Sequence, residues 1–131
     1  MFIDASAAIA ILSGEEDGEA LANRLEQAET RLVSPLSLYE TIAGLARKRR
    51  CPVEEAHELV NLFVAEIDAQ LVEITAEIGE AALAAFRRFG KGRHKADLNM
   101  GDCFAYACAQ VHGMPLLYKG NDFVHTDIAR G

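Results

Sequence analysis

The chain has 131 residues, half of them hydrophobic and a quarter charged, which predicts a single globular domain over residues 1–131. Its formal net charge of −7 at pH 7 excludes a protein that binds nucleic acid through overall positive charge. No apolar run is long enough to cross a membrane, no signal-peptide pattern opens the sequence, and the three cysteines form no CxxC pair. We therefore expect a cytoplasmic protein with reduced thiols and no membrane partner.

Short apolar segments alternate with amphipathic ones along the chain. Strands are expected at 2–3, 31–33, 71–74 and 114–118, with 126–128 as a short last strand or a tail. Helices are expected at 5–12, 15–28, 34–47, 53–68, 75–89 and 101–112. This alternation predicts an α/β fold with a mostly parallel sheet of four or five strands and helices on both faces.

The stretch from Leu98 to Phe123 organises the rest of the chain. Gly101-Asp102 is expected to open a helix, with the Asp102 side chain capping its first backbone N–H groups. Gly113 and Pro115 end that helix, and a buried strand follows them. Asp122 then comes just after the carboxyl end of the strand, where ligands collect in open α/β sheets.

Four acidic residues are candidates for one site: Asp4, Glu40, Asp102 and Asp122. Asp4 and Asp122 follow strands and Glu40 lies in the helix after the second strand, whereas the helix of Asp102 precedes a strand, so its place at the same edge is not predicted. Carboxylates that converge raise each other's pKa unless a cation joins them, and a site of oxygen ligands suits Mg²⁺ or Mn²⁺. Such a metal suits phosphodiester hydrolysis.

Each acid also has a purely structural interpretation. Asp4 and Asp102 fit N-caps, Glu40 would complete a capping box with Ser37, and Asp122 lies in a turn sequence. Any one of the four could be structural, and only their joint placement favours function.

Nine of the thirteen Lys and Arg residues fall in two short segments, Arg47–Arg50 and Arg87–Lys95. Solvated helix ends would explain either segment alone. An acidic protein can nevertheless hold RNA where basic patches face it, and we expect the second segment to contact the RNA backbone. The residues predicted to do so are Arg87, Arg88, Lys91, Arg93 and Lys95.

Three motifs resemble one known family over nearly the whole chain. They are Phe2-Ile3-Asp4-Ala5-Ser6-Ala7, Ser34-Pro35-Leu36-Ser37-Leu38-Tyr39-Glu40, and the run from Gly90 through Gly101-Asp102-Cys103-Phe104 to Lys119-Gly120-Asn121-Asp122-Phe123 and Thr126-Asp127-Ile128. Together they resemble the PIN-domain family and, within it, the VapC-type toxins of bacterial toxin–antitoxin pairs.

The resemblance implies a three-layer α/β/α fold and an Mg²⁺-dependent endoribonuclease, with Mn²⁺ as a substitute, neutralised by a partner antitoxin and often dimeric. It implies that Asp4 and Asp102 bind the metal, that Glu40 and Asp122 complete the acidic site, and that Ser6 supports a ligand or water. Relatives often carry two acids before the phenylalanine where this chain has Asn121, so the fourth acid is either Asp122 or Asp127.

Two other interpretations remain open. A non-catalytic PIN-like module could bind RNA or protein and keep its acids for structural reasons. A doubly wound phosphotransferase also uses an Asp after the first strand, but Ser6 stands where a second Asp would be expected. Apolar faces between Leu36 and Val64 are expected to be partly exposed and to support association with a protein partner or a second copy.

Overall fold

The central layer of the protein is a sheet of four parallel strands in the order β3–β2–β1–β4. The computed structural model describes residues 1–131. The strands are only two residues long: Phe2–Ile3 (β1), Leu32–Val33 (β2), Gln70–Leu71 (β3) and Leu116–Leu117 (β4).

Side chains alternate between the two faces of this sheet and build two separate cores. Phe2 pairs in register with Leu32 and Leu116, and all three enter one cluster of buried residues. Ile3 and Leu117 enter a second cluster on the opposite face. Both faces are therefore buried, as expected for a parallel sheet.

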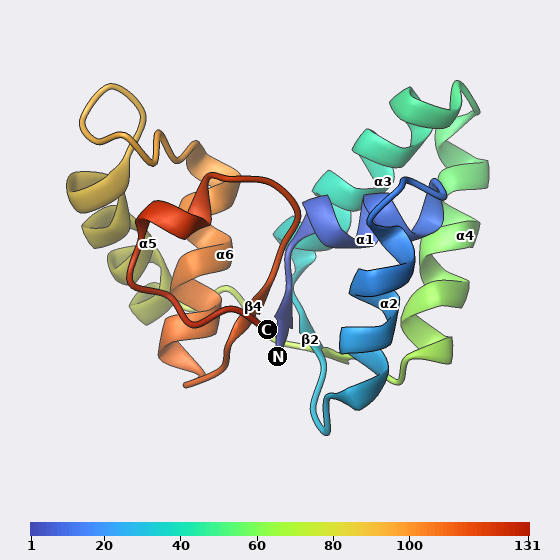
Figure 1. Ribbon diagram of the computed structural model, residues 1–131, viewed down its shortest axis with the longest axis horizontal. Coiled ribbons are helices and arrows are strands. Elements are labelled where there is room, and N and C mark those ends of the chain that lie inside the picture. The colour runs from blue at the N-terminus through green and yellow to red at the C-terminus, as the bar shows by residue number, and fades with distance from the viewer.

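Helices cover both faces, which confirms the three-layer α/β/α arrangement (Figure 1). Their bounds are Ala5–Leu12 (α1), Gly18–Gln27 (α2), Pro35–Arg49 (α3), Val53–Glu66 (α4), Ala76–Phe89 (α5) and Met100–Val111 (α6). Helices α5 and α6 pack on the first core, and α1 and α2 pack on the second, which Phe63 of α4 also enters. The pair α3 and α4 buries a third, smaller cluster around Leu45 and Val60.

The ends of the predicted sheet differ from the observed ones. Strand β3 stops at Leu71 instead of running through 71–74, and both of its residues are exposed because it lies at the edge of the sheet. Residues 126–128 form no strand: the short 3₁₀ helix η1 (Phe123–His125) precedes them, and a single parallel bridge then joins Arg130 to Leu116. All three cysteines are free, and no helix combines the length and apolar character that a bilayer span requires.

Candidate active site

Asp4 follows β1 directly and is the N-cap of α1, with only 5 % of its surface exposed. Its Oδ2 accepts hydrogen bonds from the Ser6 backbone N–H, at 3.0 Å, and from the Ser6 hydroxyl. Burial raises the pKa of Asp4, and the bonds from Ser6 oppose that rise. The Ser6 Oγ also accepts from the Lys119 N–H at 3.0 Å, so one hydroxyl ties Asp4 to the chain that follows β4.

Glu40 lies in the second turn of α3, and its expected capping box with Ser37 is wrong. Ser34 is the N-cap, Pro35 starts the helix, and Ser34 and Ser37 exchange side-chain-to-backbone bonds at 2.9 and 3.0 Å. Glu40 takes no part in this cap, because the helix begins directly after β2, with Ser34 rather than Ser37 as its N-cap. The structural explanation for Glu40 is thereby removed.

The Glu40 carboxylate lies against the backbone of Gly101, at the start of α6. A Cβ at position 101 would overlap the carboxylate oxygens, so only glycine permits this approach. The glycine at position 101 therefore permits close packing of α3 against α6, and it is not needed for a turn.

Asp102 lies at the third position of α6, and its expected role as N-cap is wrong. Asn99 is the N-cap: its side-chain oxygen accepts from the Asp102 N–H at 2.9 Å, and Asp102 Oδ2 accepts from the Asn99 N–H at 3.1 Å. Helices α5 and α6 run in opposite directions, joined by the 90–99 loop, which places the start of α6 at the edge where the strands end (Figure 1). This pairing brings Asp102 to the other acids.

The acids influence one another electrostatically. The pKa of Glu40 rises to about 7 through burial first and then through Asp4 and Asp102. The pKa of Asp102 rises to about 6 through burial, with Asp4 and Asp122 adding to the rise against the bond from Asn99. Four carboxylates are thus coupled, although Asp122 itself is exposed and caps η1 without a side-chain bond.

Asp127 lies in a different environment. It accepts hydrogen bonds from the Tyr106 hydroxyl and, at 3.2 Å, from Arg88 Nη2, and these donors lower its pKa. None of the raised pKa values in the acidic group has Asp127 among its causes. Asp127 is therefore engaged with Tyr106 and Arg88, whereas Asp122 acts electrostatically on Asp4 and Asp102, which favours Asp122 as the fourth acid.

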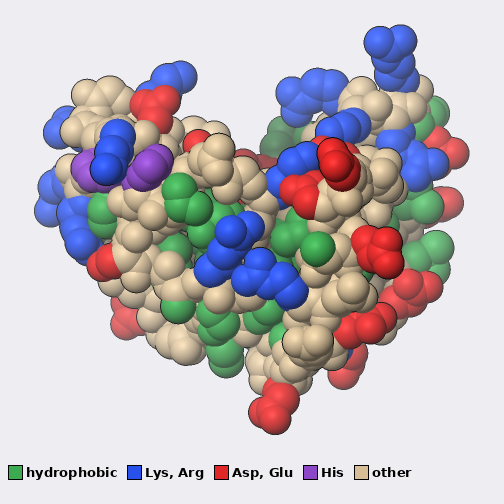
Figure 2. All heavy atoms as spheres, viewed as in Figure 1, with side chains coloured by type: hydrophobic (Ala, Val, Ile, Leu, Met, Phe, Trp, Pro, Cys, Tyr) green, Lys and Arg blue, Asp and Glu red, His purple; other side chains and the backbone are tan.

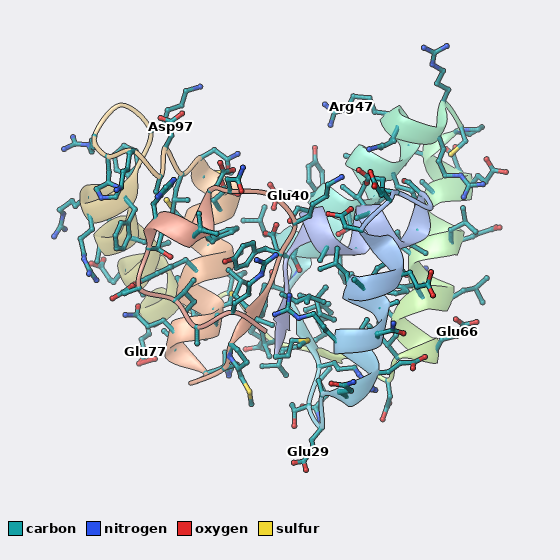
Figure 3. The ribbon with its side chains drawn as sticks, in the orientation of Figure 1. Glu29, Glu40, Arg47, Glu66, Glu77 and Asp97 are labelled. Carbon is teal, nitrogen blue, oxygen red and sulfur yellow. The ribbon has the colours of Figure 1, made fainter.

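Asp4, Glu40 and Asp102 line a cleft of about 350 Å³ between α1, α3 and α6. Figure 3 shows Glu40 between the half of the molecule that holds α5 and α6 and the half that holds α1 to α4, with Arg47 further along α3. Tyr39 and Arg47 also line this cleft, and the sequence interpretation did not assign either residue to the site. The helical spacing of the sequence could have indicated Arg47, because it lies seven residues after Glu40, two helical turns further along the same face.

The residues of the cleft fit a hard divalent cation. No three His, Cys, Asp or Glu side chains approach closely enough to form a complete ligand cage. Mg²⁺, however, is usually held by one or two carboxylates with several waters. A partly buried acidic group with only oxygen donors, in which burial and then mutual repulsion raise pKa values, matches that mode and not a zinc site.

Comparison with known proteins assigns the chain to a family. The family model of the PIN domain matches residues 1–129. Ribonuclease VapC30 of Mycobacterium tuberculosis is 45 % identical over 129 residues, which cover 98 % of this chain and 96 % of that protein. The chain is a VapC-type member of the PIN-domain family.

Two solved structures share the fold of this PIN domain. One is Mycobacterium tuberculosis VapC20, described as a sarcin–ricin-loop-cleaving toxin, with a TM-score of 0.76 and 19 % identity over 99 % of this chain and 97 % of the other. The other is a toxin–antitoxin complex from Klebsiella pneumoniae, with a TM-score of 0.71 and 17 % identity over 96 % and 92 %. At these identities the likeness concerns the fold.

The five basic residues predicted to contact RNA are all exposed, at the end of α5 and in the 90–99 loop of this PIN domain. Figure 2 shows Lys and Arg side chains on both rims of the hollow between the two halves. Arg88 pairs with Asp127 and lies 4.6 Å from the Phe89 ring centroid, and Arg93 lies 5.1 Å from that of Phe86. The other three, Arg87, Lys91 and Lys95, have no ionic partner. None of the five lines the acidic cleft.

Proposed function

We propose that this VapC-type PIN domain is a cytoplasmic, Mg²⁺-dependent endoribonuclease toxin that a cognate antitoxin neutralises. The observation that carries the proposal is the convergence of Asp4, Glu40 and Asp102 in one cleft, with Asp122 close enough to raise the pKa of two of them. The 45 % identical relative that is named a ribonuclease supports RNA as the substrate.

Each residue of the cleft has a part in this proposal. Asp4 and Asp102 would hold the ion, which when bound supplies activation of a water nucleophile and neutralisation of charge on the phosphate oxygens. Ser6 fixes the orientation of the Asp4 carboxylate through its two donors. Glu40 and Asp122 add negative charge around the ion, and a bound divalent cation would relieve the repulsion among the four carboxylates.

The deciding variant is Asp102→Asn, because Asn keeps the shape and can accept the capping bond from Asn99. We expect the parent to cleave RNA with Mg²⁺ or Mn²⁺ and not to cleave it in EDTA. Cleavage by the variant should be lower by about 100-fold or more. Its melting temperature in EDTA should equal or exceed that of the parent, because one of several like charges is removed. The matched control is Asp97→Asn in the 90–99 loop, where Asp97 accepts from the Gly92 N–H at 3.1 Å, and it should cleave like the parent.

Full cleavage by a well-folded Asp102→Asn protein would contradict the assignment. RNA or protein binding by a parent that never cleaves would favour the alternative, a non-catalytic PIN-like binding module.

The proposed partners are RNA, the antitoxin and a second copy of the chain. The solved fold neighbour in a toxin–antitoxin complex supports the antitoxin. The expected exposure of apolar side chains between residues 36 and 64 is confirmed for Val53 at 57 % and Leu62 at 63 %. Light scattering at micromolar concentration tests the homodimer, and inhibition of cleavage by a purified candidate antitoxin tests the second partner.

A further inference from the structure

One face of α3 forms a wall of the acidic cleft and carries two groups that the proposed chemistry does not use. Tyr39, Ala43 and Arg47 recur every four residues, so they lie on the same face of the helix, and all three line the cleft. A rise of about 1.5 Å per residue places Tyr39 and Arg47 about 12 Å apart along the axis. Ala43 and Gly44, which lie between them, have little or no side chain and leave room in the cleft at that point.

Tyr39 stands apart from the other two tyrosines. It is 71 % exposed, whereas Tyr106 and Tyr118 are each 2 % exposed and pack in the first core. An aromatic ring left in solvent beside a carboxylate of the site has no role in packing. Such a ring offers a flat face on which an unpaired base can stack.

Arg47 differs from the two basic residues that follow it. Lys48 pairs with Glu15 at 2.8 Å, and Arg49 donates to the Leu12 carbonyl at 3.3 Å. Arg47 forms no salt bridge, even though it lines a cleft that contains three carboxylates. Its planar guanidinium is therefore free for a phosphate, the anion to which that group is best matched.

We propose that Tyr39 and Arg47 form a nucleotide-binding wall, in which Tyr39 stacks on an unpaired base and Arg47 contacts the phosphate of a neighbouring nucleotide. The inference rests on the proposed ribonuclease function and assigns to it two positioning residues, which would hold an RNA whose bases are unpaired at the cleft. A base inside a duplex is stacked on both faces and has none to offer Tyr39.

The test measures binding without catalysis. Fluorescence anisotropy follows a 5′-labelled RNA of mixed sequence, as a single strand and annealed to its complement, in EDTA across a series of salt concentrations. The variants are Tyr39→Ala, Tyr39→Phe and Arg47→Ala. Lys48→Ala is the matched control, because it removes the same charge from the next residue while its side chain points to Glu15.

We expect Tyr39→Ala to weaken single-strand binding by about tenfold and Tyr39→Phe to keep it, since stacking needs the ring and not the hydroxyl. Arg47→Ala should weaken binding of every sequence and lower the salt slope by about one, while Lys48→Ala leaves the slope unchanged. The duplex should bind more weakly than the single strand and should not respond to Tyr39→Ala.

Unchanged single-strand binding in both Tyr39→Ala and Arg47→Ala would overturn the wall, even if the parent cleaves RNA. Absence of any RNA binding by the parent in EDTA would also overturn it, because neither group needs a metal to make its contact. Conversely, a parent that never cleaves but binds single strands through these two residues would refute the nuclease and leave the wall standing.

Discussion

The two sides of the molecule, one built on α3 and the other on α5 and α6, carry the same kind of basic side chain but hold it differently. On the α3 side, Arg47 lines the acidic cleft and has no ionic partner. On the α5–α6 side, Arg88 and Arg93 lie over phenylalanine rings, and Arg88 is also paired with Asp127. A basic segment in the sequence is thus a mixture of free and engaged charges, and only the fold separates them.

The largest expected effect comes from the point where the two sides touch, Glu40 against Gly101. Gly101→Ala places a methyl group where the Glu40 carboxylate lies, so the carboxylate must move. We expect cleavage to fall by about 100-fold, since displacements of about 1 Å have that cost. Single-turnover cleavage with Mg²⁺ measures it.

The control for that variant is Gly79→Ala in α5, where an added Cβ meets nothing within 4 Å. It should stabilise the helix by about 0.5–1 kcal/mol and leave cleavage unchanged. Equal cleavage by both alanine variants would show that the position of Glu40 is unimportant.

The next effect separates the free from the engaged side chains among the five basic residues at the end of α5 and in the 90–99 loop. Replacing the free Arg87, Lys91 and Lys95 together with Ala should lower the salt slope of RNA binding by up to about three, one for each lost phosphate contact. Replacing the engaged Arg88 and Arg93 should change it by less than one, because their charges are already stacked or paired. An unchanged slope in the triple variant would reassign the loop to solvent or to a protein partner.

A smaller effect is the pH dependence of stability in EDTA. The pKa of Glu40 is about 7 in the folded protein against an ordinary 4.5, so the folded state keeps a proton that the unfolded state loses between these values. Stability should therefore fall as pH rises from about 4.5 to 7 and level off above, by on the order of 1 kcal/mol after solvent screening. Thermal melts of the parent and Glu40→Gln measure this. The variant should lose the slope between about pH 6 and 7, whereas Asp102, whose pKa is raised to about 6, still contributes at lower pH. A parent slope that Glu40→Gln leaves intact would place its origin elsewhere.

The smallest effect distinguishes the two candidates for the fourth acid. Asp127→Asn should keep the bond from Tyr106 and lose an ion pair whose side chains are each 54 % exposed, at about 0.5 kcal/mol or less. Its cleavage should match that of the parent, whereas Asp122→Asn should cleave more slowly, because Asp122 acts on Asp4 and Asp102 electrostatically and so adds negative charge around the proposed cation. Slow cleavage by Asp127→Asn alone would reverse the choice.

What the sequence could predict follows from the range of the interactions involved. The four strands and six helices lie close to their expected positions because alternating and helical spacings are local signals. The caps were predicted less well: Ser34 competes with Ser37 and Asn99 with Asp102, and the choice depends on where the preceding segment ends. The position of Asp102 beside Asp4 requires the antiparallel pairing of α5 and α6, a tertiary arrangement that no local pattern encodes.

The hydroxyl of Ser6 has a consequence for the protein while it is being made. It receives the Lys119 N–H, 113 positions away, and β1 takes β4 as one of its two neighbours in the sheet. Chains leave the ribosome N-terminus first, so Asp4 emerges long before the strand and the backbone group that fix its surroundings. A nascent chain that has not yet released Lys119 therefore lacks one of the contacts that hold Asp4 in place, and the surroundings of this carboxylate are completed only when nearly the whole chain is available.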